Sequence, residues 1–207
     1  MIDLFITAFV TFFVVIDPVG IAPVFAGLTQ GTPAGHPRRM ALKGVAISAI
    51  VLLFFAVAGR PFLNALGITL DALKVAGGFM LFMIALEMVF EKRTERRGNA
   101  AEKSYRDHPE DISVFPIAVP LLAGPGAIAS VILLMADYPG DYLAQGVVLA
   151  AMGVTLLLTL VAFLGAERLM RALGATFSTV LTRVLGIVLA AFAAQFMLDG
   201  VKGALLS

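Results

Sequence analysis

Two short stretches of the sequence place residues suited to ligand binding inside long apolar segments. They are VVIDPVGIAPVF at residues 14–25 and PLLAGPGAI at residues 120–128. Proline at the first turn of a helix costs no hydrogen bond. Each stretch is therefore typical of a broken helix, whose second half starts at Pro18 in the first stretch and at Pro125 in the second. The candidate binding residues are Asp17, Pro18, Gly20 and Pro23 in the first stretch, and Gly124, Pro125, Gly126 and Ala127 in the second.

The start of a half-helix can bind an anion. It presents unpaired N–H groups and about half a positive charge, which suits a carboxylate, and glycine lets a ligand approach the backbone closely. A zwitterionic substrate could place its carboxylate there and its ammonium on Asp17, or on carbonyls freed by the break. Asp17 could equally hold a proton or Na⁺, or only cap its own half-helix. Both prolines could also be kinks that serve packing alone.

The composition places these stretches in a membrane protein. Sixty per cent of the residues are hydrophobic and 14% are charged, with a mean hydropathy of +0.98, whereas soluble domains are about 45–50% apolar. The chain has no cysteine, and His36 and His108 fall in hydrophilic stretches. We therefore expect no metal site and no cofactor. A net charge of +1 gives no indication of a nucleic-acid partner.

Six apolar segments have the length of membrane-spanning helices. The predicted fold class is all-α, a polytopic membrane protein with one transmembrane domain over residues 1–207 and helices one and four broken near mid-membrane. A hydrophilic linker at 92–111 separates residues 1–91 from residues 112–207. The predicted spans are 4–30, 40–59, 70–90, 112–135, 142–165 and 178–198, with an amphipathic piece at 60–69 and a connecting piece at 167–176.

The basic residues predict the orientation. Twelve of the fifteen Lys and Arg residues fall in the connections between spans 1–2, 3–4 and 5–6, and three fall on the other side. Since cytoplasmic loops carry the excess of basic residues, we expect both termini on the extracytoplasmic side.

The chain also resembles itself at an offset of 107 residues. PVGIAPV at 18–24 falls on PGAIASV at 125–131, and ALGIT at 65–69 falls on ALGAT at 172–176. Such matches can arise by chance in sequence rich in Ala, Leu and Gly. Taken as a repeat, each copy has three spans, so the second copy is inverted. Inverted repeats with broken helices are typical of secondary transporters that bind substrate near the bilayer midplane.

Two further polar residues lie inside predicted spans. Glu87 is about one turn from the basic linker, so its side chain could extend to the cytoplasmic surface. With Gln195, its approximate counterpart in the second half, it could instead line a cavity. Gly77, Gly78 and Gly186 are expected to allow close helix packing.

The two motifs, DPVGIAPVF at 17–25 and PLLAGPGAI at 120–128, their spacing and the chain length together resemble the MarC family of membrane proteins. That family is also described as six-span neutral amino acid transporters, more distantly similar to the lysine exporter superfamily. The resemblance implies a protein of the prokaryotic inner (plasma) membrane that moves small neutral amino acids by alternating access. Its partners would be the substrate, the lipid bilayer and a coupling H⁺ or Na⁺, with the oligomeric state open.

Three other functions remain open from sequence. An ion channel or cation transporter would need pore-lining carbonyls or rings of like charge, and one Asp in one half is a poor filter. A membrane enzyme is not expected, because no Ser–base, His or paired-acid arrangement falls inside a span. A non-transporting regulator would make the polar residues inside the spans dispensable. No GxxxxGK[ST] motif is present, so direct drive by ATP is not expected.

Overall fold

The computed structural model describes residues 1–33, 35–93, 96–99 and 112–206, without the side chains of 167–178, and in these ranges all the regular structure is helical. Most of the predicted linker, with His108, lies outside the described residues, as do the side chains of Arg168 and Arg171, two of the basic residues counted between spans five and six. The helices are α1 (Ile2–Ile16), α2 (Pro18–Thr29), α3 (His36–Ala65), α4 (Leu70–Val89), η1 (Ser113–Leu122), α6 (Pro125–Ala136), α7 (Tyr142–Leu164) and α8 (Ala166–Leu206).

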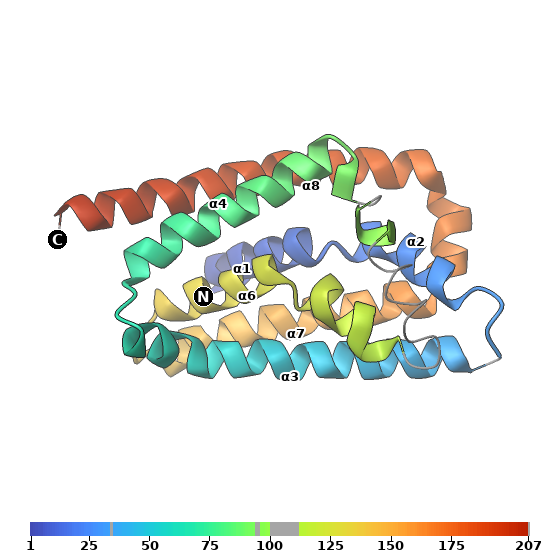
Figure 1. Ribbon diagram of the computed structural model, residues 1–207, viewed down its shortest axis with the longest axis horizontal. Coiled ribbons are helices and arrows are strands. Elements are labelled where there is room, and N and C mark those ends of the chain that lie inside the picture. The colour runs from blue at the N-terminus through green and yellow to red at the C-terminus, as the bar shows by residue number, and fades with distance from the viewer. Residues whose placement is uncertain (34, 94–95, 100–111, 207) are drawn as a thin grey trace.

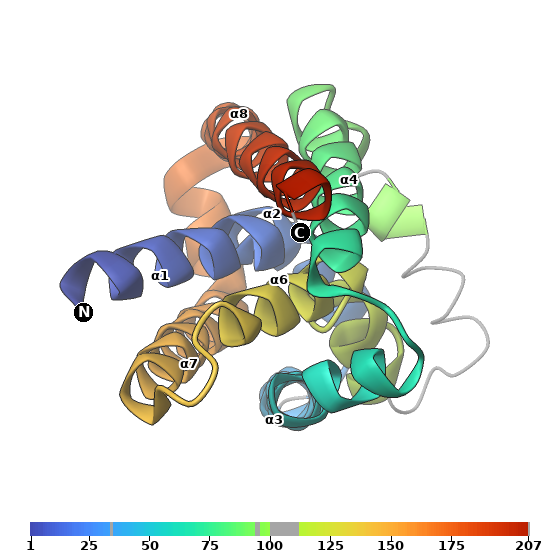
Figure 2. The same cartoon turned by 90° about the vertical axis from the view of Figure 1, so that its left-hand side faces the viewer.

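The helices form one elongated bundle (Figure 1). Both termini lie toward one end, together with the α3–α4 and α6–α7 connections, while the connections after α2 and α4 lie at the other end. Among the five spans other than the bent pair of η1 and α6, the span formed by α1 and α2 has the largest buried share, 56% of its apolar window, and it packs against α6, α7 and α8. Figure 2, which looks from the end that holds the termini, shows α4 and α8 side by side on one flank.

The predicted fold class is confirmed. Five stretches are long and apolar enough to cross a membrane, and the bent pair of η1 and α6 makes a sixth if it forms one span. The helix breaks fall where they were predicted, at Asp17 and at Ala123–Gly124. The inverted relation between the two halves stays a prediction.

Two helices are longer than predicted. α3 continues through the expected amphipathic piece to Ala65 and ends only where Gly67 adopts a left-handed conformation, with φ of 69°. There the N–H groups of Gly67 and Ile68 donate to the carbonyls of Asn64 and Leu63, the Schellman arrangement that closes helices. α8 covers 41 residues, because no proline interrupts residues 166–206. Its first part lies across the end of the bundle before the helix turns along it (Figure 1).

The half of span four before its break is not a regular helix. In η1, Phe115 and Val119 have extended backbone angles, because each precedes a proline, which disfavours the helical region for the residue before it. The N–H groups of Ile117 and Ala123 donate to carbonyls five residues earlier, which gives wide turns. Much of this segment is buried, and irregular backbone is tolerated at membrane depth where protein covers it.

Glycines bring α4 and α8 into close contact, as predicted. A Cβ added at Gly78 would lie 2.8 Å from the carbonyl oxygen of Ala193, and one added at Gly186 would lie 2.8 Å from the Cβ of Met88. Gly77 serves another contact, since its added Cβ would lie 3.1 Å from Leu133 of α6. α4 is therefore held between α8 and the second broken helix.

Candidate functional site

The first break is made by one residue, Asp17. Its φ of 58° and ψ of 65° are left-handed, a conformation that Asp visits more readily than most residues because its short side chain can hydrogen-bond locally. Its N–H donates to the carbonyl of Phe13 and so ends α1. Its carboxylate accepts the N–H of Gly20 at 3.0 Å and so caps α2. The sequence prediction of an N-cap at this position is therefore confirmed.

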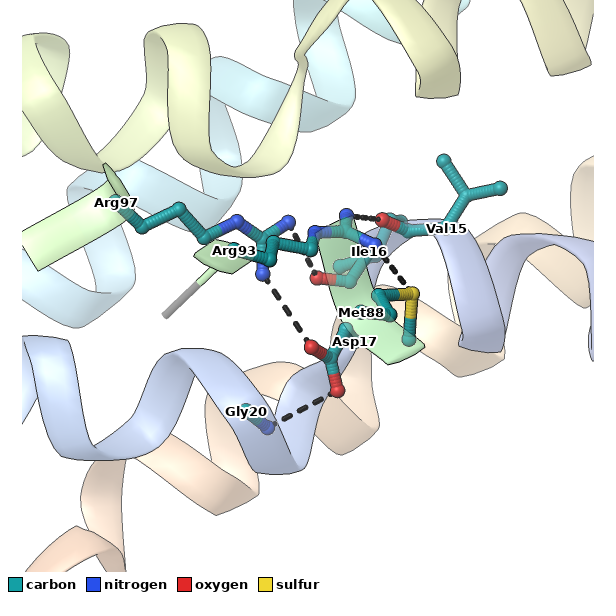
Figure 3. A network of polar contacts seen from close by, with 7 residues as sticks. All are labelled: Val15, Ile16, Asp17, Gly20, Met88, Arg93 and Arg97. Carbon is teal, nitrogen blue, oxygen red and sulfur yellow. Dashed lines mark hydrogen bonds and ion pairs between the residues drawn. The ribbon is translucent and has the colours of Figure 1, made fainter. Parts of the chain in front are cut away.

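Two arginines from the segment after α4 reach into this break (Figure 3). Arg97 approaches the Asp17 carboxylate at 3.5 Å and the carbonyl of Ile16 at 3.4 Å. Arg93 donates to the carbonyl of Val15 and to the sulfur of Met88. The last carbonyl groups of a helix have no hydrogen-bond donor within the helix. At the end of α1 the guanidinium groups of Arg93 and Arg97 are the donors. Asp17 itself is buried.

Arg93 keeps its charge under neutral conditions although it lies inside the protein. Burial, together with the nearby charge of Arg97, lowers the pKa of the Arg93 guanidinium to about 9, with Asp17 and Glu87 acting in the opposite direction. A pKa of about 9 leaves the group protonated at pH 7. The first break thus contains a buried charge network, with one carboxylate facing two guanidinium groups.

The second break borders a cavity of about 330 Å³. Three groups of residues form most of its wall. The first is the start of α6, Gly124–Ala127; the second is one side of α4, Phe79, Met80, Met83, Ile84 and Glu87; the third is Arg93, Arg96 and Arg97.

The two breaks come close to each other at this cavity. Val15, two residues before Asp17, lines it. A Cβ added at Gly126 would lie 3.2 Å from Val15 and 2.7 Å from Ile84. The start of α6 is therefore packed closely between α1 and α4.

The predicted site residues divide into two groups. Gly124, Pro125, Gly126, Ala127 and Glu87 line the cavity. Asp17, Pro18, Gly20 and Pro23 are not among the lining residues, since Asp17, Pro18 and Gly20 are buried and the Asp17 carboxylate is held between Arg97 and the N–H of Gly20.

Glu87 and Gln195 do not form the polar pair that was considered from sequence. Glu87 is paired with Arg96 at the cavity. Gln195 is exposed on α8 and donates to Asp199 at 2.8 Å. Close contacts between α4 and α8 are made at glycines, among them Gly78 of α4 and Gly186 of α8.

Sequence reasoning missed Arg93 and Arg97, which it assigned to a solvated linker. One signal could have found them: a carboxylate inside a membrane span usually pairs with a cation, and the largest cluster of basic residues in the sequence follows span three.

The arrangement can bind a ligand that carries both charges. Three guanidinium groups and one carboxylate, Glu87, line the cavity, and Asp17 lies behind Arg97. Counting Asp17, the site has one positive charge in excess. The start of α6 adds N–H donors on the same side. An anionic group is favoured near Arg97 and α6, and a cationic group is favoured only near Glu87.

The chain is similar to known proteins along nearly its whole length. Residues 2–205 match the family described as MarC family integral membrane protein. A UPF0056 membrane protein of Methanocaldococcus jannaschii is 36% identical, covering 98% of both chains. The UPF0056 membrane protein YhcE of Escherichia coli is 34% identical over 94% of this chain and 90% of its own length. The UPF0056 membrane protein YvbG of Bacillus subtilis is 32% identical over 98% of this chain and 96% of its own length. No solved structure matches.

Proposed function

The chain belongs to the MarC family of integral membrane proteins, and on this premise we propose that it is a secondary transporter of small neutral amino acids across the inner membrane. The observation that supports this most directly is the cavity at the second break, where Glu87 and the arginines face one space of about 330 Å³. That volume lies at the lower end of the range of about 300–1,000 Å³ typical of small-molecule sites. A small zwitterion matches both its size and its charges.

Each end of the substrate has a place in this proposal. The α-carboxylate binds near Arg97 and the N–H groups at the start of α6, since an arginine fork and a helix start both favour carboxylates. The ammonium binds Glu87. The apolar wall contributed by Met83 and Ile84 would take a small apolar side chain without adding charge. This assignment moves the ammonium site from Asp17 to Glu87, because Glu87 lines the cavity whereas the buried Asp17 does not.

Alternating access would use the two broken helices. Discontinuous helices that meet at a central site are the usual structural basis for such movement, and here they meet at Val15 and Gly126. The contact between Arg97 and Asp17 is long, at 3.5 Å, so it could break and form as the halves move. Excess positive charge in the cavity argues against the cation-channel alternative.

Uptake by the purified protein in liposomes tests the proposal. A panel of labelled amino acids, led by alanine and glycine, is measured with and without Na⁺ and pH gradients, which also identifies the coupling ion. Glu87→Gln removes the carboxylate, and we expect uptake to fall by about tenfold, the value of one lost charge-assisted hydrogen bond.

Glu91→Gln is the matched control. Glu91 lies four residues further along, pairs with Arg183 and does not line the cavity, so its uptake should stay within about twofold of the parent. No uptake of any amino acid by the parent protein would reject the proposal. Uptake that is equal in Glu87→Gln and the parent would reject Glu87 as the ammonium site.

A further inference from the structure

The cavity is open along the side of α4. Phe79, Met80 and Met83 line it, and they are 57%, 38% and 46% exposed. Phe79, Met83 and Glu87 are spaced four residues apart, so they share one face of the helix. From Phe79 to Glu87 this face extends about 12 Å by the helical rise. It is apolar for most of that length and charged where α4 ends.

The charged end of the opening has an accessible guanidinium group. The side chain of Arg96 is 73% exposed and contacts Glu87 through one terminal nitrogen. A guanidinium group has five N–H donors, so this contact leaves donors for a ligand. Arg93 and Arg97 lie deeper in the same cavity, at the first break. Arg96 is therefore the first positively charged group that a ligand entering the cavity from the side would meet.

We propose that this lateral opening binds an anionic phospholipid, with its phosphate at Arg96 and one acyl chain along Phe79, Met80 and Met83. Basic pockets between transmembrane helices are known to favour acidic headgroups. The opening has the polarity of a lipid in one leaflet, because the charged residues are at the end of the span and the apolar residues extend toward its middle. The outer arginine binds the phosphate, so this site lies at the mouth of the same cavity and shares Met83 with the proposed amino acid site. Lipid binding is measured without transport, so its failure would leave the proposed function standing.

A binding experiment on the detergent-solubilised full chain tests the proposal. Thermal unfolding is followed while dioleoyl phosphatidylglycerol is titrated, and dioleoyl phosphatidylcholine serves as the neutral lipid with the same chains. We expect the apparent affinity for phosphatidylglycerol to be about tenfold higher. Glycerol 3-phosphate forms a third arm, which presents the anion without acyl chains, and we expect it to give no shift at the same concentration.

Three variants locate the site. Arg96→Gln should lower the affinity for phosphatidylglycerol by about tenfold, and Arg96→Lys should keep most of it, because the positive charge remains. The matched control is Arg183→Gln, since Arg183 is an exposed arginine that pairs with a glutamate at the same end of α4 but lies outside the cavity. It should change the affinity by less than about twofold.

Each contrary result overturns the inference. Equal affinity for the two lipids would show that charge is not recognised. A shift with glycerol 3-phosphate as large as that with phosphatidylglycerol would show a site for free anions instead of lipid. Loss of affinity in Arg183→Gln as large as in Arg96→Gln would show that the lipid binds elsewhere on the surface.

Discussion

Asp17 ends one helix and begins the next through a single residue in the left-handed conformation. Its backbone N–H closes α1 and its carboxylate caps α2, while Arg97 balances the charge. Three properties of Asp are used here: a short side chain, an acceptor oxygen and a negative charge. Asn has the first two and lacks the third, so substitutions can separate capping from charge pairing.

Replacing Asp17 should destabilise the protein in two steps. Asp17→Asn keeps the cap and the tolerance of the left-handed region but leaves Arg97 without its carboxylate. We expect the free energy of unfolding to fall by about 1–3 kcal/mol. Asp17→Ala should cost about 1–3 kcal/mol more, because it also loses the cap and a residue suited to positive φ. Unfolding in detergent micelles measures both values. Equal losses in the two variants would contradict a capping role.

Gly20 is needed by the side chain of Asp17. A Cβ added at Gly20 would lie 2.2 Å from a carboxylate oxygen of Asp17, so Gly20→Ala must displace the cap. We expect Gly20→Ala to lower the free energy of unfolding by about 1–3 kcal/mol. Gly27→Ala in the same helix is the control, since nothing lies within 4 Å of its added Cβ, and it should stabilise the helix by about 0.5–1 kcal/mol. If both variants unfold at the same temperature, the steric explanation fails.

At the scale of elements, the packing of α4 determines the geometry of the cavity. One face of α4 contacts α8 through glycines, Gly77 contacts α6, and a third face lines the cavity. Helix association inside a membrane depends on close packing of small residues because the hydrophobic effect contributes little there. A shift of α4 would therefore change the cavity as well as the helix contact.

Gly186→Leu should separate α8 from α4. Its added Cβ alone would lie 2.8 Å from the Cβ of Met88 and 3.1 Å from the carbonyl oxygen of Ala85, so the larger side chain cannot enter without moving a helix. We expect a loss of about 1–3 kcal/mol in the free energy of unfolding. Gly146→Leu in α7 provides the comparison, since its added Cβ meets nothing within 4 Å. An unchanged unfolding midpoint for Gly186→Leu would argue against this helix contact.

At the scale of the whole molecule, ion pairs connect the two halves of the chain at both ends. Lys74 of α4 lies 2.9 Å from Asp137, at the end of α6, and Arg183 of α8 pairs with Glu91. The pair of Arg183 and Glu91 is about half exposed, and exposed pairs are worth only about 0–1 kcal/mol each. The bundle is therefore held mainly by helix packing, and its orientation in the membrane follows from the distribution of basic residues.

The orientation can be tested directly because the chain has no cysteine. Gln30 follows the last residue of α2 and Asn64 lies in the last turn of α3, and these two helix ends lie at opposite ends of the bundle (Figure 1). Both residues are exposed, so each can be replaced by Cys in an otherwise unreactive protein. We expect Asn64→Cys to react with a membrane-impermeant maleimide added outside intact cells, and Gln30→Cys to react only after the membrane is opened. Labelling in the reverse pattern would place the termini in the cytoplasm.

The sequence by itself determined the class of protein, the number of apolar segments and the positions of both breaks. These follow from local properties: the length of apolar runs needed to cross a bilayer and the effect of proline on its own helix. The cap at Asp17 and the close contacts of Gly78 and Gly186 were predictable for the same reason, since each depends on one residue and its immediate neighbours.

Only the tertiary structure decided what fills the breaks. Arg93 and Arg97 follow the first break by about eighty residues in sequence, and no local pattern shows that the chain returns there. The division of the predicted site, with the second break at the cavity and Asp17 behind Arg97, depends in the same way on how α4 packs against its neighbours. Charge pairing inside a membrane protein is a long-range property, because the partner of a buried carboxylate can come from any segment that the fold brings within a few ångströms.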